Sequence, residues 1–505
     1  MTSSIGEPSN LIPLLASDGA SAEISRLIFN GLVKYGPDLK LTGDLAERWE
    51  LLDSGQKIIF YLRKDVLWQD GAPFTAKDVK FTFDRLRDPG VPTPYAASFD
   101  KVKSLRVLDD LTVQVDYSEP FSPGLVSWTM GIIPEHLLRD KDFKTTDFRR
   151  HPVGTGPYRL EQWLSGQQLV LTANKRYFEG VPNIERYVYR IIPDQATTFL
   201  ELQAEALDGV ALSPLQFEKQ TETPFFKKNY TPYHWSGRQY TYLAYNLKNP
   251  LFSDPRVRHA LGMAVDKEEI IRATLLGHGR VSAGPFLAES WASDPTVKPG
   301  AYDPEGARRL LKEAGWVDSN GDGLLEKEGH PFSFTVLTNQ GNDQRKMICE
   351  LIQKRWRDIG VDMKIQVVEW SVLLKEFIQG RRFEAVLLAW SLSLEPDDVY
   401  AVFHSSQTAP GQFNFVSYKN SEVDGLLEKG RTLFSVEERV PIYQRVHRLI
   451  AEDAPYLFLV ESEALLMLHR RFEGVTVTPL GVGYDFIHWA VPLNKQKYKI
   501  TLADA

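Results

Sequence analysis

The sequence predicts an α/β protein that folds into two or three domains. Segments with the patterns of strands and helices alternate along the chain. The chain has 505 residues, whereas one domain usually holds roughly 100–200. Hydrophobic residues make up 43% of the sequence, which is enough to fill more than one core.

The first well-defined strand and helix follow each other near the start of the chain. Residues 57–63 contain an apolar run rich in β-branched and aromatic residues, as a buried strand requires. A tight turn is expected at residues 69–71. Thr75 then begins a helix as its N-cap, and Asp78, three residues later, completes a capping box less strongly than a glutamate would. The helix would bury one face formed by Val79, Phe83 and Leu86.

Similar signals mark two later helices and another strand. Asp266 with Glu269 repeats the capping pattern, and Gly277 stops that helix. Over residues 303–315, an aspartate cap, a proline at the first helical position and a terminal glycine all agree on one helix. Residues 332–336 predict a strand.

The charge balance and cysteine content exclude several classes of protein. Lys and Arg number 59 against 66 Asp and Glu, a net charge of −7. Since there is also no basic tract, nucleic acid is not expected as a partner. The one cysteine, Cys349, can form neither an internal disulfide nor a thiolate metal site. The longest apolar stretch, residues 385–394, is far shorter than the roughly 20 residues that span a bilayer.

The chain shows no secretion signal at its start. Residues 1–4 run directly into residues 6–13, which have the character of the start of a mature domain. We expect a secretion signal, with or without a lipid-anchor cysteine, to have been removed, which predicts a periplasmic or other extracytoplasmic location. A cytoplasmic protein is the alternative.

Sites for catalysis, metals and cofactors are not evident. The ten histidines are scattered, with no i, i+4 pair, and neither His-Glu-x-x-His nor Gly-x-Ser-x-Gly occurs. Residues 154–159 begin like a dinucleotide fingerprint but lack its third glycine. Residues 318–324 match the first half of a calcium loop, yet position twelve is Gly329 rather than glutamate, so a polar hairpin is the simpler interpretation. We therefore predict no enzyme activity, no metal site and no cofactor.

Two stretches of the chain carry a recognisable pattern. The first joins residues 43–49, the strand at 57–63 and residues 66–79. The second joins Asn246-Leu247 to residues 250–267. Together they resemble family 5 of the extracytoplasmic solute-binding proteins, the dipeptide- and oligopeptide-binding receptors of ABC importers. The resemblance covers nearly the whole chain.

The resemblance implies a large two-lobed periplasmic-binding-protein fold, of the cluster C type, with an inserted extra subdomain and a hinge between the lobes. The first lobe would combine residues 1–40, 154–243 and 472–505. The inserted subdomain would be residues 41–153, and the second lobe residues 244–471. Since the chain crosses between lobes more than once, hinge closure around a ligand is the expected motion.

The resemblance also implies which residues face the ligand. The chain has 11 Trp, 20 Tyr and 27 Phe; most are expected to be core, and a subset to line the cleft. The candidates from the first lobe, the inserted subdomain, the crossover and the second lobe are Asp18, Gly19, Tyr95, Trp128, Tyr242, Tyr245, Asn246, Trp370, Trp390 and Ser391. For each aromatic residue, plain core packing is an equal alternative.

The segment after the strand at residues 385–390 departs from the family. In typical members an aspartate three residues after the tryptophan holds the amino terminus of the peptide, whereas here that position is Ser393. An unpaired buried ammonium group is costly, so Glu395 or Asp397 would have to take over this contact. An arginine used by a well-known member for peptide carboxylates is replaced by Leu387.

We therefore expect a monomeric receptor that captures oligopeptides between two lobes and delivers them to an ABC permease in the cytoplasmic membrane. A receptor for a sugar or a metal chelate is the alternative among binding proteins. A cleft hydrolase that uses Glu395 and Asp397 as acid and base is the alternative from another class. Both carboxylates lie on one short loop, which argues against the hydrolase.

Overall fold

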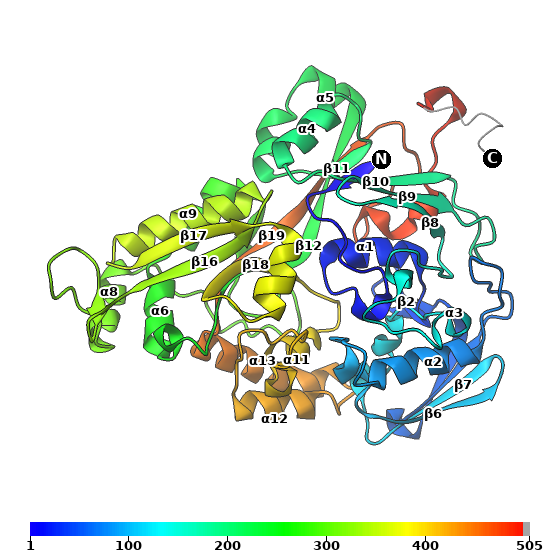
Figure 1. Cartoon of the computed structure of the whole chain (residues 1–505), viewed down its shortest axis with the longest axis horizontal. Helices are drawn as coiled ribbons and strands as arrows, with labels where there is room; N and C mark the ends of the chain where they lie inside the picture. The colour runs from blue at the N-terminus through cyan, green and yellow to red at the C-terminus, as the bar shows by residue number, and fades with distance from the viewer. Residues whose placement is uncertain (498–505) are drawn as a thin grey trace.

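The computed structural model describes residues 1–497, and the last part of the predicted first lobe, residues 498–505, lies outside this range. Two bodies lie side by side (Figure 1). One contains mostly the N-terminal part of the chain, and the other contains mostly residues from about 245 to 460. Each body has hydrophobic core clusters of its own.

The N-terminal body contains two four-stranded sheets. One sheet has the order β4-β5-β7-β6, with strands Ala46–Leu52, Lys57–Leu62, Thr112–Tyr117 and Val102–Asp109. The other has the order β1-β10-β9-β8, with strands Thr2–Ser4, Arg186–Ile191, Gln168–Ala173 and Tyr158–Leu164. A small β2-β3 ribbon pairs Val33–Tyr35 with Leu41–Gly43. The helices are α1 (Gly19–Ile28), α2 (Ala76–Arg87) and α3 (Glu135–Leu138). One continuous core, from Leu11 to Ile191, joins these elements.

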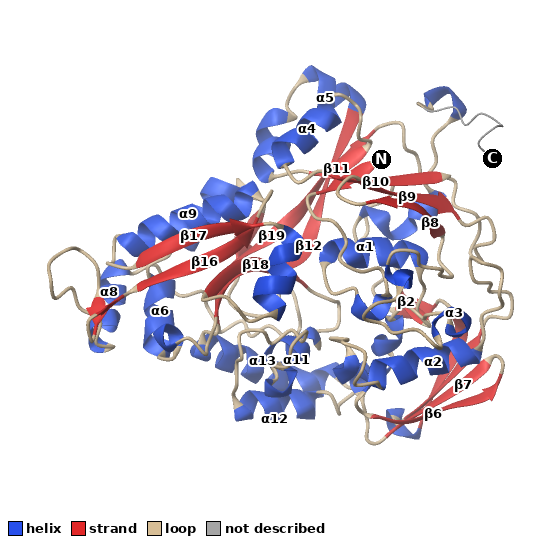
Figure 2. Cartoon of the chain, viewed as in Figure 1, coloured by secondary structure: helices blue, strands red, loops and turns tan. Residues whose placement is uncertain are grey.

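The second body is built on a seven-stranded mixed sheet with the order β11-β19-β12-β18-β16-β17, to which β13 adds on β19. These strands are Gly209–Ala211, Tyr456–His469, Tyr230–Tyr245, Ala385–Ser391, Ser333–Asn339, Asp362–Val368 and Gly279–Val281. Figure 2 shows helices gathered around this sheet. The α-helices of this body are α6 (Pro255–Met263), α7 (Lys267–Ile270), α8 (Pro304–Glu313), α9 (Asp343–Arg357), α10 (Trp370–Val372), α11 (Asp398–Phe403), α12 (Ser421–Gly430) and α13 (Val436–Asp453).

Alternation along the strands separates the two faces of this sheet. Leu243 and Tyr245 of β12 lie in the core shared with α6, α8 and α9, whereas Tyr242 and Ala244 lie in the core shared with α12 and α13. This follows from the pleat of a strand, in which successive side chains point to opposite faces. Helices therefore cover both faces of the sheet.

Two long strands, β12 and β19, run between the bodies (Figure 1). The first part of β12 pairs with the end of β19, next to β11 and the helices α4 (Gln195–Gln203) and α5 (Pro224–Asn229). The second part pairs with the start of β19 and with β18. The register shifts between Ser236 and Tyr240, where Arg238 adopts a positive φ of 47°. This bulge marks where β12 passes from one set of neighbours to the other.

The local predictions near the start of the chain are confirmed. Strand β5 spans Lys57–Leu62, and α2 begins after Thr75 with a complete capping box, in which Asp78 accepts the Thr75 backbone N–H at 2.9 Å. Val79 and Leu86 of the predicted face are fully buried, and Phe83 packs against the same core.

The predicted helices after Asp266 and Asp303 are present, with one difference. Helix α8 has the Asp303 cap and ends before Gly315, whose φ is +90°. Helix α7 is short and continues as a π-helical turn, Ile271–Leu275. Asp266 caps this helix by accepting the Glu269 N–H at 2.9 Å, but the capping box is incomplete because the Glu269 side chain pairs with Arg355 at 2.6 Å.

The polar hairpin prediction is confirmed by the small ribbon of β14 (Glu326–Lys327) and β15 (His330–Pro331). The Asp318 carboxylate accepts backbone N–H groups of Gly321 and Gly323, so the turn itself uses this side chain. No helix within residues 1–497 is both long and apolar enough to cross a membrane.

Candidate functional site

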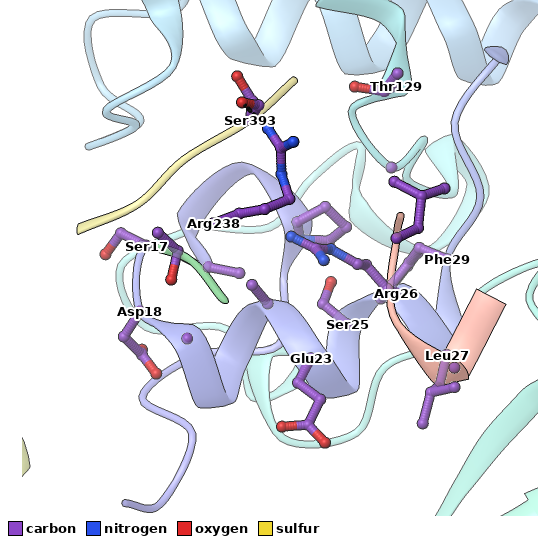
Figure 3. A pocket seen from close by; sticks show the side chains of 18 of the residues that line it. Ser17, Asp18, Glu23, Ser25, Arg26, Leu27, Phe29, Thr129, Arg238 and Ser393 are labelled. Atoms are coloured by element: carbon purple, nitrogen blue, oxygen red, sulfur yellow. Dashed lines mark hydrogen bonds between the residues drawn. The ribbon is translucent and has the colours of Figure 1, made fainter. Parts of the chain in front are cut away.

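A cavity of about 2150 Å³ lies between the two bodies. Helix α1 and residues 94–99 and 123–131 line it from the N-terminal body, and the end of β18 with residues 391–398 lines it from the second body. Figure 3 shows the part in which α1 faces the chain around Ser393. Because typical pockets for small molecules measure about 300–1,000 Å³, this cavity has room for a larger ligand.

The β18 strand offers backbone groups to this cavity. Its residues from Leu388 to Ser391 line the cavity wall. On one side β18 pairs with β12 along its whole length, but on the other side β16 pairs only with Ala385 and Val386. Beyond Val386, no strand of the described chain occupies that second side. An extended peptide can add to such an edge through main-chain hydrogen bonds.

Trp390 lies at the end of this strand and is half-buried. Its ring stacks on Tyr242, with centroids 6.1 Å apart and planes at 16°, and Tyr242 in turn stacks on Tyr456 at 4.4 Å. Phe413 packs edge-on against Trp390, with ring centroids 5.4 Å apart. Tyr242 is thus a buried support, while Trp390 presents part of its ring to the cavity.

Aromatic contacts continue across the cavity to the N-terminal body. Tyr95 packs edge-on against Phe413 with centroids 5.9 Å apart. Its hydroxyl donates to the Ala16 carbonyl at 2.7 Å, which fixes the ring beside the start of α1. Trp370 also lines the cavity from the second body, and it lies so close to Gly6 that a Cβ there would come within 3.1 Å of its ring. The two bodies therefore touch at both aromatic positions.

The start of α1 is held by Asp18. This buried carboxylate caps the helix by accepting the Ser21 N–H at 2.9 Å and the hydroxyls of Ser21 and Ser9 at 2.6 Å. Since protein donors use both oxygens, Asp18 acts as a structural cap at the cavity wall. Gly19 has no neighbour within 4 Å of where a Cβ would stand, so the space beside it is open to the cavity.

The loop after β18 is organised by Ser393. Its N–H donates to Asp398 at 2.6 Å and its hydroxyl to the Glu395 carbonyl at 2.6 Å. Arg238, on the bulge of β12, donates to the carbonyls of Leu392 and Ser393. Figure 3 shows Arg238 extending toward Ser393. These hydrogen bonds connect the bulge of β12 to the loop that follows β18.

The two acids expected to replace the missing aspartate are already paired. Asp397 lies 3.1 Å from the guanidinium of Arg431, and Glu395 pairs with Arg439. Both arginines are almost completely buried. Burial nevertheless raises the pKa of Asp397 to about 6, with Arg431 opposing the shift. An incoming ammonium would have to compete with these guanidinium groups, so we no longer assign the anchor to Glu395 or Asp397.

Asp398, the third acid of this loop, has one carboxylate oxygen that is available to a ligand. One oxygen accepts the Ser393 N–H, and no ion pair within 4 Å involves its carboxylate in residues 1–497. Burial raises the pKa of Asp398, with further contributions from Glu395, while the Ser393 hydrogen bonds and Arg238 oppose the shift. A cation bound in the cavity would favour its charged form.

Two further charged residues of α1, Glu23 and Arg26, line the cavity. Glu23 accepts hydroxyl hydrogen bonds from Tyr187 at 3.3 Å and Tyr189 at 3.5 Å. Its side chain is accessible from the cavity, yet the surrounding protein removes enough solvent to raise its pKa. Sequence reasoning missed both residues, although their i, i+3 spacing places them close together on one side of a helix.

Three predicted residues do not line the cavity. Trp128 is 1% exposed and packs in the N-terminal core between Phe60 and Phe99, with its indole N–H donating to Tyr117. Tyr245 points to the opposite face of the sheet from Tyr242. The Asn246 amide donates to the Phe383 carbonyl at 2.8 Å and shapes a turn. We therefore assign no ligand contact to these three residues.

The cavity wall contains no histidine or cysteine within residues 1–497. A group of side chains that could hold a metal ion, His234, His278 and Glu463, lies outside the cavity lining.

Comparisons with known proteins agree with this geometry. The profile of the bacterial extracellular solute-binding proteins, family 5 middle, matches residues 40–412. The oligopeptide-binding protein AppA of Bacillus subtilis is 34% identical over 495 residues, covering 96% of this chain and 90% of that protein.

Two solved structures are similar along almost the whole chain. AppA from Bacillus subtilis in complex with a nonapeptide superposes with a TM-score of 0.93 at 32% identity, covering 97% of this chain and 98% of that one. NikZ from Campylobacter jejuni in complex with Ni(L-His) has a TM-score of 0.88 at 27% identity, with the same coverage. The predicted two-lobed fold is thereby confirmed.

Proposed function

The chain belongs to the family 5 bacterial extracellular solute-binding proteins, and on that basis we propose that it is a receptor that captures oligopeptides and delivers them to the permease of an ABC importer. The receptor acts as a monomer outside the cytoplasm and releases its ligand unchanged. The observation that carries the choice of ligand is the unpaired edge of β18 in a cavity of about 2150 Å³.

The backbone of an extended peptide can form hydrogen bonds with the free N–H and C=O groups along that edge of β18. Main-chain hydrogen bonds give affinity that does not depend on sequence, and side-chain pockets add selectivity. Trp390 and Trp370 supply apolar surface for side chains of the peptide, and the large cavity accommodates different side chains together with water.

The charged residues of the cavity orient the peptide. Asp398 takes the amino terminus, because one of its carboxylate oxygens is used by no ion pair among residues 1–497. Arg26 and Arg238 offer guanidinium groups to carbonyl or carboxylate groups of the ligand. Arginine suits this task because its planar donors match the geometry of a carboxylate.

We divide the chain into a first lobe of residues 1–40, 154–243 and 472 onward, an inserted subdomain of residues 41–153, and a second lobe of residues 244–471. The hinge is formed by the long strands β12 and β19, with the bulge at Arg238 as the point where β12 changes its neighbours. Closure around this hinge brings Tyr95 against Phe413.

Calorimetric titration with a dipeptide, a pentapeptide and a nonapeptide of related sequence tests this proposal. We expect affinity to rise from the dipeptide to the longer peptides, because more backbone groups reach the β18 edge. Nickel-histidine and an oligosaccharide serve as the competing ligands. Tighter binding of either competitor than of every peptide would replace the peptide proposal with one of the alternatives.

A further inference from the structure

Three side chains with metal-binding atoms converge beside the hinge strands, outside the lining of the ligand cavity. His234 belongs to β12, Glu463 to β19, and His278 to the turn that leads into β13. One ligating atom from each lies within 4.8 Å of the other two. They are distant in sequence, and the pairing of β12, β13 and β19 brings them together.

The distances suit a small divalent ion. Glu463 Oε2 lies 2.8 Å from His278 Nδ1 and 3.2 Å from His234 Nδ1. A tetrahedral zinc ion with bonds of about 2.0–2.1 Å holds its ligand atoms about 3.3–3.4 Å apart. The two distances from Glu463 Oε2 therefore need to lengthen only slightly to match the spacing around such an ion.

A fourth residue orients one of the histidines. His278 uses Nδ1 toward Glu463, and its Nε2 lies 2.6 Å from Glu218 on the π-helical turn Gln216–Gln220. Phe217 packs edge-on against the same imidazole at 5.6 Å. Metal-binding histidines commonly donate their second ring N–H to a carboxylate, which fixes the tautomer and the ring orientation. Glu218 is thus a positioning residue.

The site is accessible from solvent. The side chain of His234 is 61% exposed and that of Glu463 is 36% exposed, whereas that of His278 is only 16% exposed. The partly buried histidine supplies a fixed ligand, and the two exposed side chains close on an ion that enters from water. A fourth coordination position remains open to a water molecule.

From this convergence we propose that His234, His278 and Glu463 form a binding site for a divalent transition-metal ion of the zinc, cobalt or nickel class. A set of two imidazoles and one carboxylate favours these ions, whereas calcium and magnesium prefer ligand sets made of oxygen atoms. The ion joins β12, β19 and the turn before β13 at the level of the bulge. None of the three residues lines the ligand cavity, and the site does not depend on the proposed peptide function.

The first test uses the full-length protein without a polyhistidine tag and cobalt(II) as a spectroscopic probe. We expect a visible absorption band of a four-coordinate cobalt site at one equivalent, lost on addition of zinc. The variants His278→Ala and Glu463→Gln should each weaken binding by about 100-fold or more, beyond the range for outer residues. His151→Ala, an exposed histidine elsewhere, should bind like the wild type.

Glu218 gives the sharper control. Glu218→Ala should weaken cobalt binding by about 10–100-fold and alter the spectrum, while thermal unfolding of the metal-free protein changes little. The two contacts of His278 could also belong to an imidazolium that simply bridges two carboxylates. In that case the wild type would bind cobalt no more tightly than His278→Ala, and this result would overturn the proposal.

Discussion

The guanidinium of Arg431 lies 3.1 Å from the carboxylate of Asp397 and also donates to the Ala97 carbonyl at 3.1 Å. The Arg431 carbonyl accepts the Ser122 N–H at 2.7 Å. Ala97 and Ser122 lie in the chain between α2 and α3 of the N-terminal body, and Ala97 packs against the core of the second body, to which Arg431 and Asp397 belong. One buried arginine therefore links the loop of the cavity to the opposite body, which makes it a candidate for holding the closed form.

Arg431→Met should favour the open form and lower ligand affinity. Removing one partner of a buried ion pair typically costs about 3–5 kcal/mol, and here that loss is shared between folding and closure. Small-angle X-ray scattering with saturating peptide should give a larger radius of gyration than for the wild type. The double variant Arg431→Met/Asp397→Asn should recover part of the stability. No recovery would mean that the pair does not act as a unit.

Trp390→Ala should weaken peptide binding more than it weakens the fold. Trp390 is half-buried at the cavity wall, so we expect a loss of about 1–3 kcal/mol in binding free energy. Trp128→Ala is the matched control, because this fully buried ring should cost about 3–5 kcal/mol of stability. Denaturant unfolding and calorimetry separate the two effects. Equal affinity in folded Trp390→Ala would remove this residue from the site.

Asp398→Asn should lower affinity for a peptide with a free amino terminus. Loss of one charge from a buried ion pair commonly costs about 2–5 kcal/mol of binding free energy. An N-acetylated peptide has no charged amino terminus, so its affinity for Asp398→Asn should be almost the same as for the wild type. Glu23→Gln is the control, as Glu23 lies in the same cavity on α1. If Glu23→Gln discriminates between the two peptides and Asp398→Asn does not, the amino terminus lies at α1 instead.

His447 should make stability depend on pH below neutrality. It is completely buried, and its Nδ1 accepts the Asp294 N–H at 2.9 Å, so burial lowers its pKa to about 4. The unfolded chain binds a proton near pH 6.5, while the folded chain does so only near pH 4. The unfolding free energy should therefore fall by up to about 3 kcal/mol as pH drops across that range.

The measurement for this prediction is the difference between the wild type and His447→Gln. The difference is needed because burial raises the pKa of Asp44 to about 6, which changes stability with the opposite sign in the same pH range. In denaturant unfolding between pH 4 and 8, the unfolding free energy of the wild type should fall relative to that of His447→Gln as pH drops. His151→Ala should keep the wild-type curve. Parallel curves for the wild type and His447→Gln would contradict the assignment.

Features set by neighbouring residues could be predicted from the sequence. The cap at Thr75 and Asp78 and the strand at residues 57–62 depend on local contacts, and both are present. Alternation would also have shown that Tyr242 and Tyr245, three residues apart on one strand, point to opposite faces. Only one of them could face the cavity.

Features set by distant residues could not be predicted in this way. The partners of Asp397 and Glu395 are Arg431 and Arg439, which only the fold brings to the loop. Trp128 is surrounded in sequence by residues that line the cavity, but its own side chain turns inward from the 3-10 helix Val126–Thr129. An aromatic residue gives the same sequence signal in a core and in a cavity wall.

Native mass spectrometry after incubation with a mixed library of peptides tests the central claim most directly. The account predicts one peptide of several residues bound per protein chain, with the bound and released peptides identical in mass to those supplied. Retention of no peptide from the library, or release of shortened peptides, would contradict it.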